Sequence, residues 1–508
     1  MASDAKLSGP DLANGIAASS LAAGEKILGH AAGEPVLLTR IGDEYFAIGA
    51  ACSHYGGPLA EGLIDGDTVR CPWHHACFSL KTGEALSAPA LNPVARWFVE
   101  TRGDQVVVTD KLERDPLAPT YPIGSRRSNP GDVVIIGAGA AGTAAAEMLR
   151  RCGFHGRVTV VDPEPDSPYD RPNLSIDYLA GNALEEWIPI RPPGFYDAHQ
   201  IDIVRGSVTR IDIAGKSVAV DGRSPISYGA LLLATGAEPI KLTVPGADLP
   251  HVHYLRSLGD SRSIVAAAKA AKSAVVVGTS FIGLEVAASL RARNIDTHVV
   301  APEPIPLERV LGAELGTFIK SFHEEHGVHF HLGRKKQRIE RDAVILDDGS
   351  RVAADLVVIG VGVKPRLDLA EQAGLAVDRG VTVNEFLETS AAGVFAAGDI
   401  ARWPDPHSGE RIRVEHWVVA QRMGQTAARN ILGAKEAFAD VPFFWSAHYD
   451  VSINYVGHAE KWDGLRVDGS AEKHDVAVRF ERGGKTLAVA TIFRDEESLR
   501  AETELKRT

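Results

Sequence analysis

Two short stretches of the chain place soft metal ligands close together. "CSHYGG" supplies Cys52 and His54, and "CPWHHACFSL" supplies Cys71 and His74. Thiolates and imidazoles are ligands of zinc and of iron–sulfur clusters. A common structural zinc pattern takes two cysteines from one turn and two histidines from another, whereas here each stretch gives one of each. The spacing predicts a metal centre held by these four residues.

One cysteine and one histidine per loop suit a Rieske [2Fe–2S] centre, in which two thiolates hold one iron and two imidazoles the other. "CPWH" and the glycine pair after His54 resemble Rieske loops, and zinc is the lesser alternative. His75 comes one position too late to be a ligand, so we expect a structural loop residue with positive φ, with a proton-handling role as the lesser alternative. Cys77 is expected to be a small buried side chain. Gly57 and Trp73 stand where high-potential Rieske proteins carry a bridging disulfide, which favours a lower-potential, ferredoxin-like centre.

A glycine-rich turn follows an apolar run in "DVVIIGAGAAGTAAAEMLRR". Gly137, Gly139 and Gly142 form the pattern G-x-G-x-x-G, which permits a tight turn, close approach to a pyrophosphate and close helix packing. The next apolar run ends at Asp162, where an acid binds the ribose hydroxyls of a dinucleotide. The stretch predicts a dinucleotide site.

A second copy of this turn occurs in "SAVVVGTSFIGLEVAASLRARN", with Gly278, Ser280 and Gly283 at the three positions. The hydroxyl of Ser280 is available to donate to a pyrophosphate. After the following apolar run, the position expected to be acidic is Ala301. Glu303 comes two residues later, and no arginine precedes Arg309 in that turn. Since an acid repels a 2′-phosphate, we expect NADH rather than NADPH.

The hydrophobic pattern of the chain is strand-like near the N-terminus, changes to strand patterns that alternate with helix patterns, and becomes strand-like again near the C-terminus. The expected domains are 1–112, a small β domain with the metal centre; 113–130, a Pro- and Ser-rich linker; 131–248 and 370–440, two parts of an FAD-binding domain; 249–369, an NAD(H)-binding domain; and 441–508, a C-terminal α+β domain.

Further motifs are "PYDRPNLSIDYL", "LLLATGAEP", "VIGVGVKP", "VFAAGDIA" and "VEHWVVAQRMGQTAARNILG". Together with both glycine-rich turns they resemble FAD-dependent pyridine-nucleotide oxidoreductases of the ferredoxin reductase and apoptosis-inducing-factor type. The N-terminal metal loops narrow this to the Rieske-containing apoptosis-inducing-factor-like group. The resemblance implies an all-β Rieske domain, two Rossmann-like α/β domains and a C-terminal α+β domain, with FAD, NADH and a [2Fe–2S] cluster as cofactors.

The resemblance also implies roles for residues at matching positions. Arg171, Glu285 and Trp417 are expected nearest the reacting flavin. Asp399 is expected to bind the ribityl chain of FAD, beside Gly398. The remaining residues expected to bind cofactor on this basis are Ala234, Thr235, Gly236, Gly362, Glu415, His416 and Trp445.

One position departs from the family pattern. Family members read "RP-x-LSK", with a lysine paired to the glutamate of "GLE"; here the lysine position is Ile176, while Glu285 remains. Removing one partner of a buried ion pair leaves a costly charge, so we expect Glu285 to be protonated or re-paired. Because the family lysine could also polarise the flavin, hydride transfer is expected to be slower without it.

The charge, the cysteine count and the hydrophobic pattern of the chain exclude several classes of function and location. The net charge of −12, from 54 Lys and Arg against 66 Asp and Glu, argues against nucleic acid or an anionic membrane as the main partner. The N-terminus lacks the pattern of a secretory signal, and no charge-free apolar run reaches membrane length. Four cysteines do not make a disulfide scaffold, so a cytoplasmic location is expected.

The resulting prediction is an NAD(P)H-dependent flavoprotein oxidoreductase. Electrons are expected to pass from NADH through FAD to the Rieske cluster, and on to a ferredoxin-like protein or a small-molecule acceptor. One alternative is an NADH-responsive redox-sensing or signalling protein with low turnover, and another is the reductase component of a Rieske oxygenase system. The sequence does not distinguish a monomer from a homodimer.

Overall fold

The structure is a computed structural model that describes residues 7–112 and 129–507. The described chain divides into two compact units: residues 7–112, 147–155 and 494–507 belong to one, and residues 129–146 and 156–493 to the other. The predicted linker over 113–130 lies, except for its last two residues, outside the described residues. No helix within the described residues is long and apolar enough to cross a membrane.

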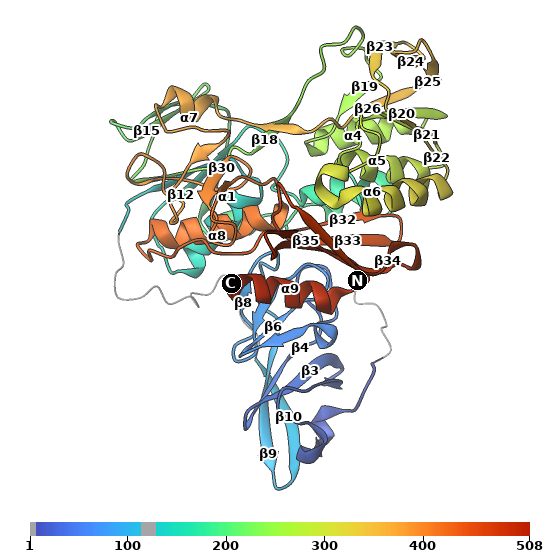
Figure 1. Cartoon of the computed structure of the whole chain (residues 1–508). Helices are drawn as coiled ribbons and strands as arrows, with labels where there is room; N and C mark the ends of the chain where they lie inside the picture. The colour runs from blue at the N-terminus through green and yellow to red at the C-terminus, as the bar shows by residue number, and fades with distance from the viewer. Residues whose placement is uncertain (1–6, 113–128, 508) are drawn as a thin grey trace. The chain divides into compact units, whose positions relative to one another are not determined.

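The smaller unit contains two antiparallel sheets (Figure 1, blue). The six-stranded sheet has the order β1-β10-β9-β4-β3-β2 and the four-stranded sheet the order β5-β6-β7-β8. The strands are β1 Ile16–Ala17, β2 Lys26–Ala31, β3 Glu34–Ile41, β4 Glu44–Gly49, β5 Leu63–Asp65, β6 Thr68–Arg70, β7 Cys77–Ser79, β8 Ala85–Ser87, β9 Arg96–Arg102 and β10 Gln105–Leu112.

Strand β3 separates two cores because successive side chains point to opposite faces. Leu37 packs in one core with Cys52 and Cys71, whereas Leu38 packs in the other with Trp97. The two predicted metal loops, one after β4 and one after β6, therefore close over the first core.

Two helical segments from elsewhere in the chain complete the smaller unit. These are the end of α1 (Ala140–Arg151), from residue 147, and the C-terminal helix α9 (Asp495–Arg507). Buried Arg151 pairs with Glu84 and donates to the carbonyl oxygen of Ala85 at 2.7 Å. The sequence had not indicated that these segments belong with the N-terminal strands.

The larger unit contains two parallel five-stranded sheets. The first has the order β13-β12-β11-β17-β29, with β11 Val133–Ile136, β12 Val158–Asp162, β13 Ile201–Arg205, β17 Ala230–Leu233 and β29 Val394–Ala396. The second has the order β19-β26-β20-β21-β22, with β19 Val252–Tyr254, β20 Ser273–Val277, β21 Asp296–Ala301, β22 Val328–Leu332 and β26 Leu356–Ile359. Strands β11, β12 and β17 are buried throughout, as parallel strands covered on both faces require.

Three helices matter for the site in this unit. Helix α5 (Phe281–Ala292) follows β20, and α8 (Trp417–Ile431) is buried along nearly its whole length. Gly424 of α8 approaches the start of α1 so closely that a Cβ would lie 2.1 Å from the carbonyl oxygen of Ala141. Helix α6 (Glu308–Glu325) lies between β21 and β22 in the sequence.

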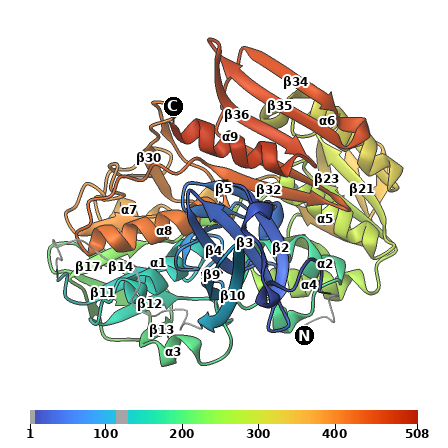
Figure 2. The same cartoon turned by 90° about the horizontal axis from the view of Figure 1, so that it is seen from below.

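A five-stranded antiparallel sheet of order β32-β33-β36-β35-β34 also belongs to the larger unit, and Figure 2 shows β34, β35 and β36 side by side. Its strands are β32 Phe443–His448, β33 Val451–Gly457, β34 Gly464–Ser470, β35 Asp475–Arg482 and β36 Lys485–Ile492. The predicted fold class, an all-β Rieske domain with two Rossmann-like α/β domains and a C-terminal α+β domain, is confirmed.

Candidate functional site

The two metal loops repeat one backbone pattern. In the first loop, the amide of Cys52 donates to the carbonyl oxygen of Gly57, and the amide of Gly56 donates to the carbonyl oxygen of Cys52. In the second loop, the amide of Cys71 donates to the carbonyl oxygen of Ala76, and the amide of His75 donates to the carbonyl oxygen of Cys71. The fifth residue of each loop has positive φ, 77° at Gly56 and 60° at His75. The predicted positive φ of His75 is thus observed, and it takes the place that glycine occupies in the other loop.

These loops bring the four predicted ligands together in pairs. The Nδ1 atoms of His54 and His74 lie 3.2 Å apart, and the thiols of Cys52 and Cys71 are close enough to shift each other's pKa. Burial lowers the pKa of His54 to about 3 and that of His74 well below its usual range, so both rings are neutral imidazoles, the form that binds metal. A thiol pair beside an imidazole pair fits the two unlike irons of a Rieske cluster.

Gly57 and Trp73, the two positions without the bridging cysteines, are neighbours across the loops. A Cβ at Gly57 would lie 2.7 Å from the sulfur of Cys71 and 3.2 Å from the Trp73 ring. Trp73 itself is 42% exposed, and Cys77 is buried as predicted.

His75 does more than fill a loop. Its side chain is fully buried, its Nδ1 is 2.6 Å from the Glu502 carboxylate, and its Nε2 is 3.1 Å from the Ser498 hydroxyl, both on α9. Arg70 lies 3.2 Å from the same carboxylate. His75 therefore ties the second metal loop to α9, a partner more than 400 positions away that sequence spacing does not indicate.

One cavity of about 1020 Å³ lies in the larger unit and is lined by parts of both glycine-rich turns. The predicted residues that line it are Gly137, Gly139, Asp162, Arg171, Ala234, Thr235, Gly236, Ser280, Glu285, Gly362, Gly398, Asp399, Glu415, His416, Trp417 and Trp445. Gly142, Gly278, Gly283 and Glu303 are not among its lining residues. Arg309 does line it, so the preference for NADH over NADPH stays a prediction.

The first turn has the shape of a phosphate cradle. A Cβ at Gly137 would lie 2.3 Å from the carbonyl oxygen of Ala234, and one at Gly142 would lie 1.9 Å from that of Gly137, so both positions require glycine. A Cβ at Gly139 would meet nothing within 4 Å, because this glycine faces the cavity. The open space at Gly139 fits a bound pyrophosphate.

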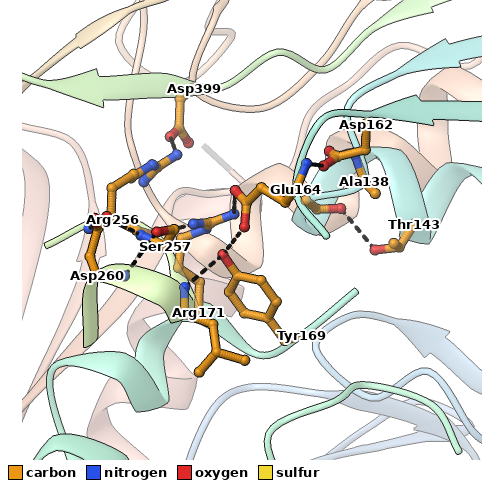
Figure 3. A network of polar contacts seen from close by, with 12 residues as sticks. Ala138, Thr143, Asp162, Glu164, Tyr169, Arg171, Arg256, Ser257, Asp260 and Asp399 are labelled. Atoms are coloured by element: carbon orange, nitrogen blue, oxygen red, sulfur yellow. Dashed lines mark hydrogen bonds and ion pairs between the residues drawn. The ribbon is translucent and has the colours of Figure 1, made fainter. Parts of the chain in front are cut away.

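The carboxylate of Asp162 holds this turn in place. It accepts hydrogen bonds from the amides of Ala138, at 2.6 Å, and Glu164, at 2.8 Å (Figure 3). The ribose-binding role of Asp162 remains a prediction. Glu164, two positions later, also lines the cavity and is an acid that the sequence analysis missed in "VVDPEP".

A polar network crosses the cavity wall (Figure 3). Arg171 donates to Glu164 at 3.3 Å and to the carbonyl oxygen of Arg256. Arg256 donates to the Asp399 carboxylate at 2.9 Å. The network joins the predicted residues Arg171 and Asp399 through Arg256, which carried no motif signal and was also missed.

Ser280 of the second turn makes two hydrogen bonds within the protein. Ser280 begins α5, where its oxygen accepts from the amide of Gly283 at 3.1 Å and its hydroxyl donates to the carbonyl of Gly360 at 2.8 Å. The single hydroxyl proton of Ser280 is engaged with Gly360 here, and donation to a pyrophosphate stays a prediction. The serine caps the helix.

The start of α8 presents a cluster of predicted residues to the cavity. Glu415 accepts from Arg413 at 2.7 Å, and burial raises its pKa. His416 is buried enough that its pKa falls to about 3, and its Nδ1 has no hydrogen-bond partner among the described residues. A buried ring nitrogen without a partner in a cavity wall fits a bound group that would engage it.

Glu285 is re-paired, as expected from the missing lysine. Its two carboxylate oxygens accept from the hydroxyls of Ser446, at 2.6 Å, and Ser175, at 2.7 Å. Burial outweighs these bonds and raises the pKa of Glu285 to about 7. Ile176 lines the same cavity next to Ser175.

Comparison with known proteins gives two family matches. Residues 131–424 match the family described as pyridine nucleotide-disulphide oxidoreductase, and residues 15–98 match the Rieske [2Fe–2S] domain. Apoptosis-inducing factor 3 of Homo sapiens is 31% identical over 476 residues, 91% of this chain and 78% of that protein. Rhodocoxin reductase of Rhodococcus erythropolis is 36% identical over 375 residues, 73% of this chain and 88% of that protein.

Among solved structures, the covalent putidaredoxin reductase–putidaredoxin complex is similar to this chain. The TM-score is 0.72 at 32% sequence identity, and the match covers 74% of this chain and 93% of that chain. The matches and the two sets of site residues agree: the chain belongs to the pyridine nucleotide-disulphide oxidoreductase family and is an FAD-dependent NAD(P)H oxidoreductase with a Rieske [2Fe–2S] domain.

Proposed function

We propose that the chain oxidises NADH at the cavity of the larger unit and passes the electrons through its own Rieske centre to a ferredoxin-like protein. The observation that carries this proposal is that residues of both glycine-rich turns line one cavity, so that two dinucleotides would meet there. Bound FAD would supply the chemistry that takes a hydride and gives up electrons singly.

The side chains of the larger unit bind and orient in this proposal. Gly137 and Gly139 would let the backbone approach the pyrophosphate of bound FAD, and Asp399, held by Arg256, would bind its ribityl chain. Trp417 and Trp445 line the cavity and exclude water from the reacting faces. In the smaller unit, Cys52, Cys71, His54 and His74 would hold the cluster.

The relatives support a protein acceptor. One is named anthranilate 1,2-dioxygenase system ferredoxin–NAD(+) reductase component, from Burkholderia cepacia, and is 34% identical over 329 residues, 64% of this chain and 81% of that protein. A ferredoxin of a Rieske oxygenase system is therefore the acceptor that we propose to test first. The small number of cysteines favours the cytoplasmic location that we propose.

The experiment compares ferredoxin reduction by the wild-type protein and by His74→Ser. The variant removes one imidazole ligand of the cluster and leaves the cavity of the larger unit untouched. We expect NADH to reduce the flavin in both proteins, but the ferredoxin only in the wild type. Equal ferredoxin reduction by the variant would show that electrons bypass the Rieske centre.

A second candidate function is an NADH-responsive redox sensor with low turnover. Ile176, at the position where the family has lysine, favours it because hydride transfer is expected to be slower without that charge. Reoxidation of the reduced protein separates the two functions. Rapid reoxidation by ferredoxin supports the reductase, and reoxidation that stays slow with every protein and dye acceptor supports the sensor.

A further inference from the structure

A row of buried polar side chains leads away from Glu285. Ser446 and His448 lie on β32, His323 lies on α6, and Tyr449 lies in the turn between β32 and β33. Glu285, Ser446, His448 and His323 are all at most 7% exposed, whereas Tyr449 is half-buried in a turn whose next residue is exposed. The row therefore connects the cavity wall with the edge of the larger unit.

Each neighbouring pair in this row is within hydrogen-bond distance. Ser446 Oγ is 2.6 Å from Glu285 Oε1 and 3.2 Å from His448 Nε2. His448 Nδ1 is 3.2 Å from His323 Nε2, and His323 Nδ1 is 3.2 Å from the Tyr449 hydroxyl. Both nitrogens of both rings thus take part, so each imidazole accepts on one side and donates on the other.

The two imidazoles are neutral. Burial lowers the pKa of His448 to about 4 and that of His323 well below its usual range. A neutral imidazole carries one ring proton, which leaves only two ways to arrange donors and acceptors along the row. In one arrangement every proton points toward Glu285, and in the other every proton points toward Tyr449.

We propose that Ser446, His448, His323 and Tyr449 form a proton wire through which Glu285 exchanges its proton with solvent. This inference rests on the proposed function, since oxidation of one NADH by two one-electron acceptors yields NAD⁺, two electrons and one proton. The electrons leave to the acceptors, and the proton goes to the Glu285 carboxylate at the cavity wall.

The transfer along the wire balances at every atom. The Glu285 proton moves to Ser446 Oγ as the serine proton moves to His448 Nε2. The Nδ1 proton of His448 moves to His323 Nε2, the Nδ1 proton of His323 moves to the Tyr449 oxygen, and the tyrosine proton leaves to water. Both imidazoles change from the Nδ1–H to the Nε2–H tautomer and neither becomes charged.

Few other titratable groups face the wire. His326 is the residue that follows helix α6, and its ring stacks on Tyr449 with the ring centroids 3.8 Å apart. Arg291 of α5 acts on Tyr449 electrostatically. Ser175, on the second oxygen of Glu285, is neutral. The raised pKa of Glu285, about 7, puts the change of its protonation state near neutral pH.

The test reads the histidine tautomers by long-range ¹H–¹⁵N NMR of ¹⁵N-histidine-labelled, FAD-loaded protein, with His448→Gln and His323→Gln used for assignment. As the pH rises through about 7, we expect both rings to change together from Nδ1–H to Nε2–H. In Glu285→Gln the change should be lost. Tautomers that stay fixed with pH, or that change equally in Glu285→Gln, would overturn the proposal.

A second variant tests the outer end of the wire. Tyr449→Phe keeps the ring that stacks on His326 and removes only the hydroxyl. We expect the tautomer of His323 in this variant no longer to follow the protonation of Glu285. His326→Phe is the matched control, and its histidine tautomers should titrate as in wild type. Identical tautomer titrations of Tyr449→Phe and wild type would contradict a role for the hydroxyl. Because the readout needs no turnover, a protein that fails to reduce ferredoxin still tests the wire.

Discussion

At the scale of single residues, Glu285 is the carboxylate whose expected lysine partner is replaced by Ile176. Its carboxylate faces the cavity, is buried, and has two serine hydroxyls in place of a lysine. Two hydroxyls stabilise the negative charge of the carboxylate less than a lysine ammonium would. Burial therefore still raises the pKa of Glu285 to about 7.

Restoring the lysine should change the chemistry. In Ile176→Lys we expect an ammonium next to Ser175 to pair with Glu285 and to speed flavin reduction by NADH, measured by rapid mixing under anaerobic conditions. Ile176→Met, similar in length without the charge, is the control and should react as wild type. A rate in Ile176→Lys that is unchanged or slower would contradict this role of the missing charge.

The raised pKa of Glu285 also makes a prediction about stability. Between the ordinary pKa of 4.5 and about 7, the folded protein keeps a proton that the unfolded chain has lost, so this group makes the protein less stable as the pH rises. Glu285→Gln removes that penalty. We expect the free energy of unfolding of the variant, measured with denaturant, to exceed that of wild type by up to about 3 kcal/mol at pH ~8 and not to differ at pH ~4. Glu303→Gln, which is away from the cavity lining, is the control. An equal difference at both pH values would exclude ionisation of Glu285 as the cause.

At the scale of elements, helix α9 is an integral part of the unit that holds the metal loops. Its buried Glu502 lies against both His75 and Arg70. Removing the carboxylate would break the buried ion pair between Glu502 and Arg70, and breaking a buried ion pair costs about 3–5 kcal/mol.

Glu502→Ala should therefore destabilise the smaller unit by about 3 kcal/mol and loosen the second metal loop. Chemical denaturation followed by the visible absorption of the cluster measures both effects. Glu504→Ala, two positions along on the exposed face of α9, is the matched control. Equal midpoints for the two variants would contradict the anchoring role of Glu502.

Local spacing predicts which residues of a loop lie together, but not their distant partners. The closeness of His54 and His74 and the positive φ of His75 follow from residue types within a few positions of one another in each loop, and the assignment of the four metal ligands stays a prediction. The partners of His75 and of Glu285 lie 427 and 161 positions away, and no periodicity connects them. Ser280 shows the same limit, because its hydroxyl proton goes to Gly360, 80 positions away.

At the scale of the whole molecule, the chain combines a cavity lined by both glycine-rich turns in one unit with the four predicted cluster ligands in the other. Carrying both in one chain links a two-electron donor to a one-electron carrier without a separate encounter between proteins. The central claim is that electrons from NADH reach the Rieske cluster of the same protein.

Anaerobic titration of the purified protein with NADH, followed by visible absorption and EPR, tests this claim most directly. We predict that the flavin absorption bleaches and that the EPR signal of a reduced Rieske cluster appears in the same titration, with no added mediator. In His74→Ser the flavin should still bleach and that signal should be missing. A wild-type flavin that is fully reduced while its cluster stays oxidised would contradict electron transfer between the two centres.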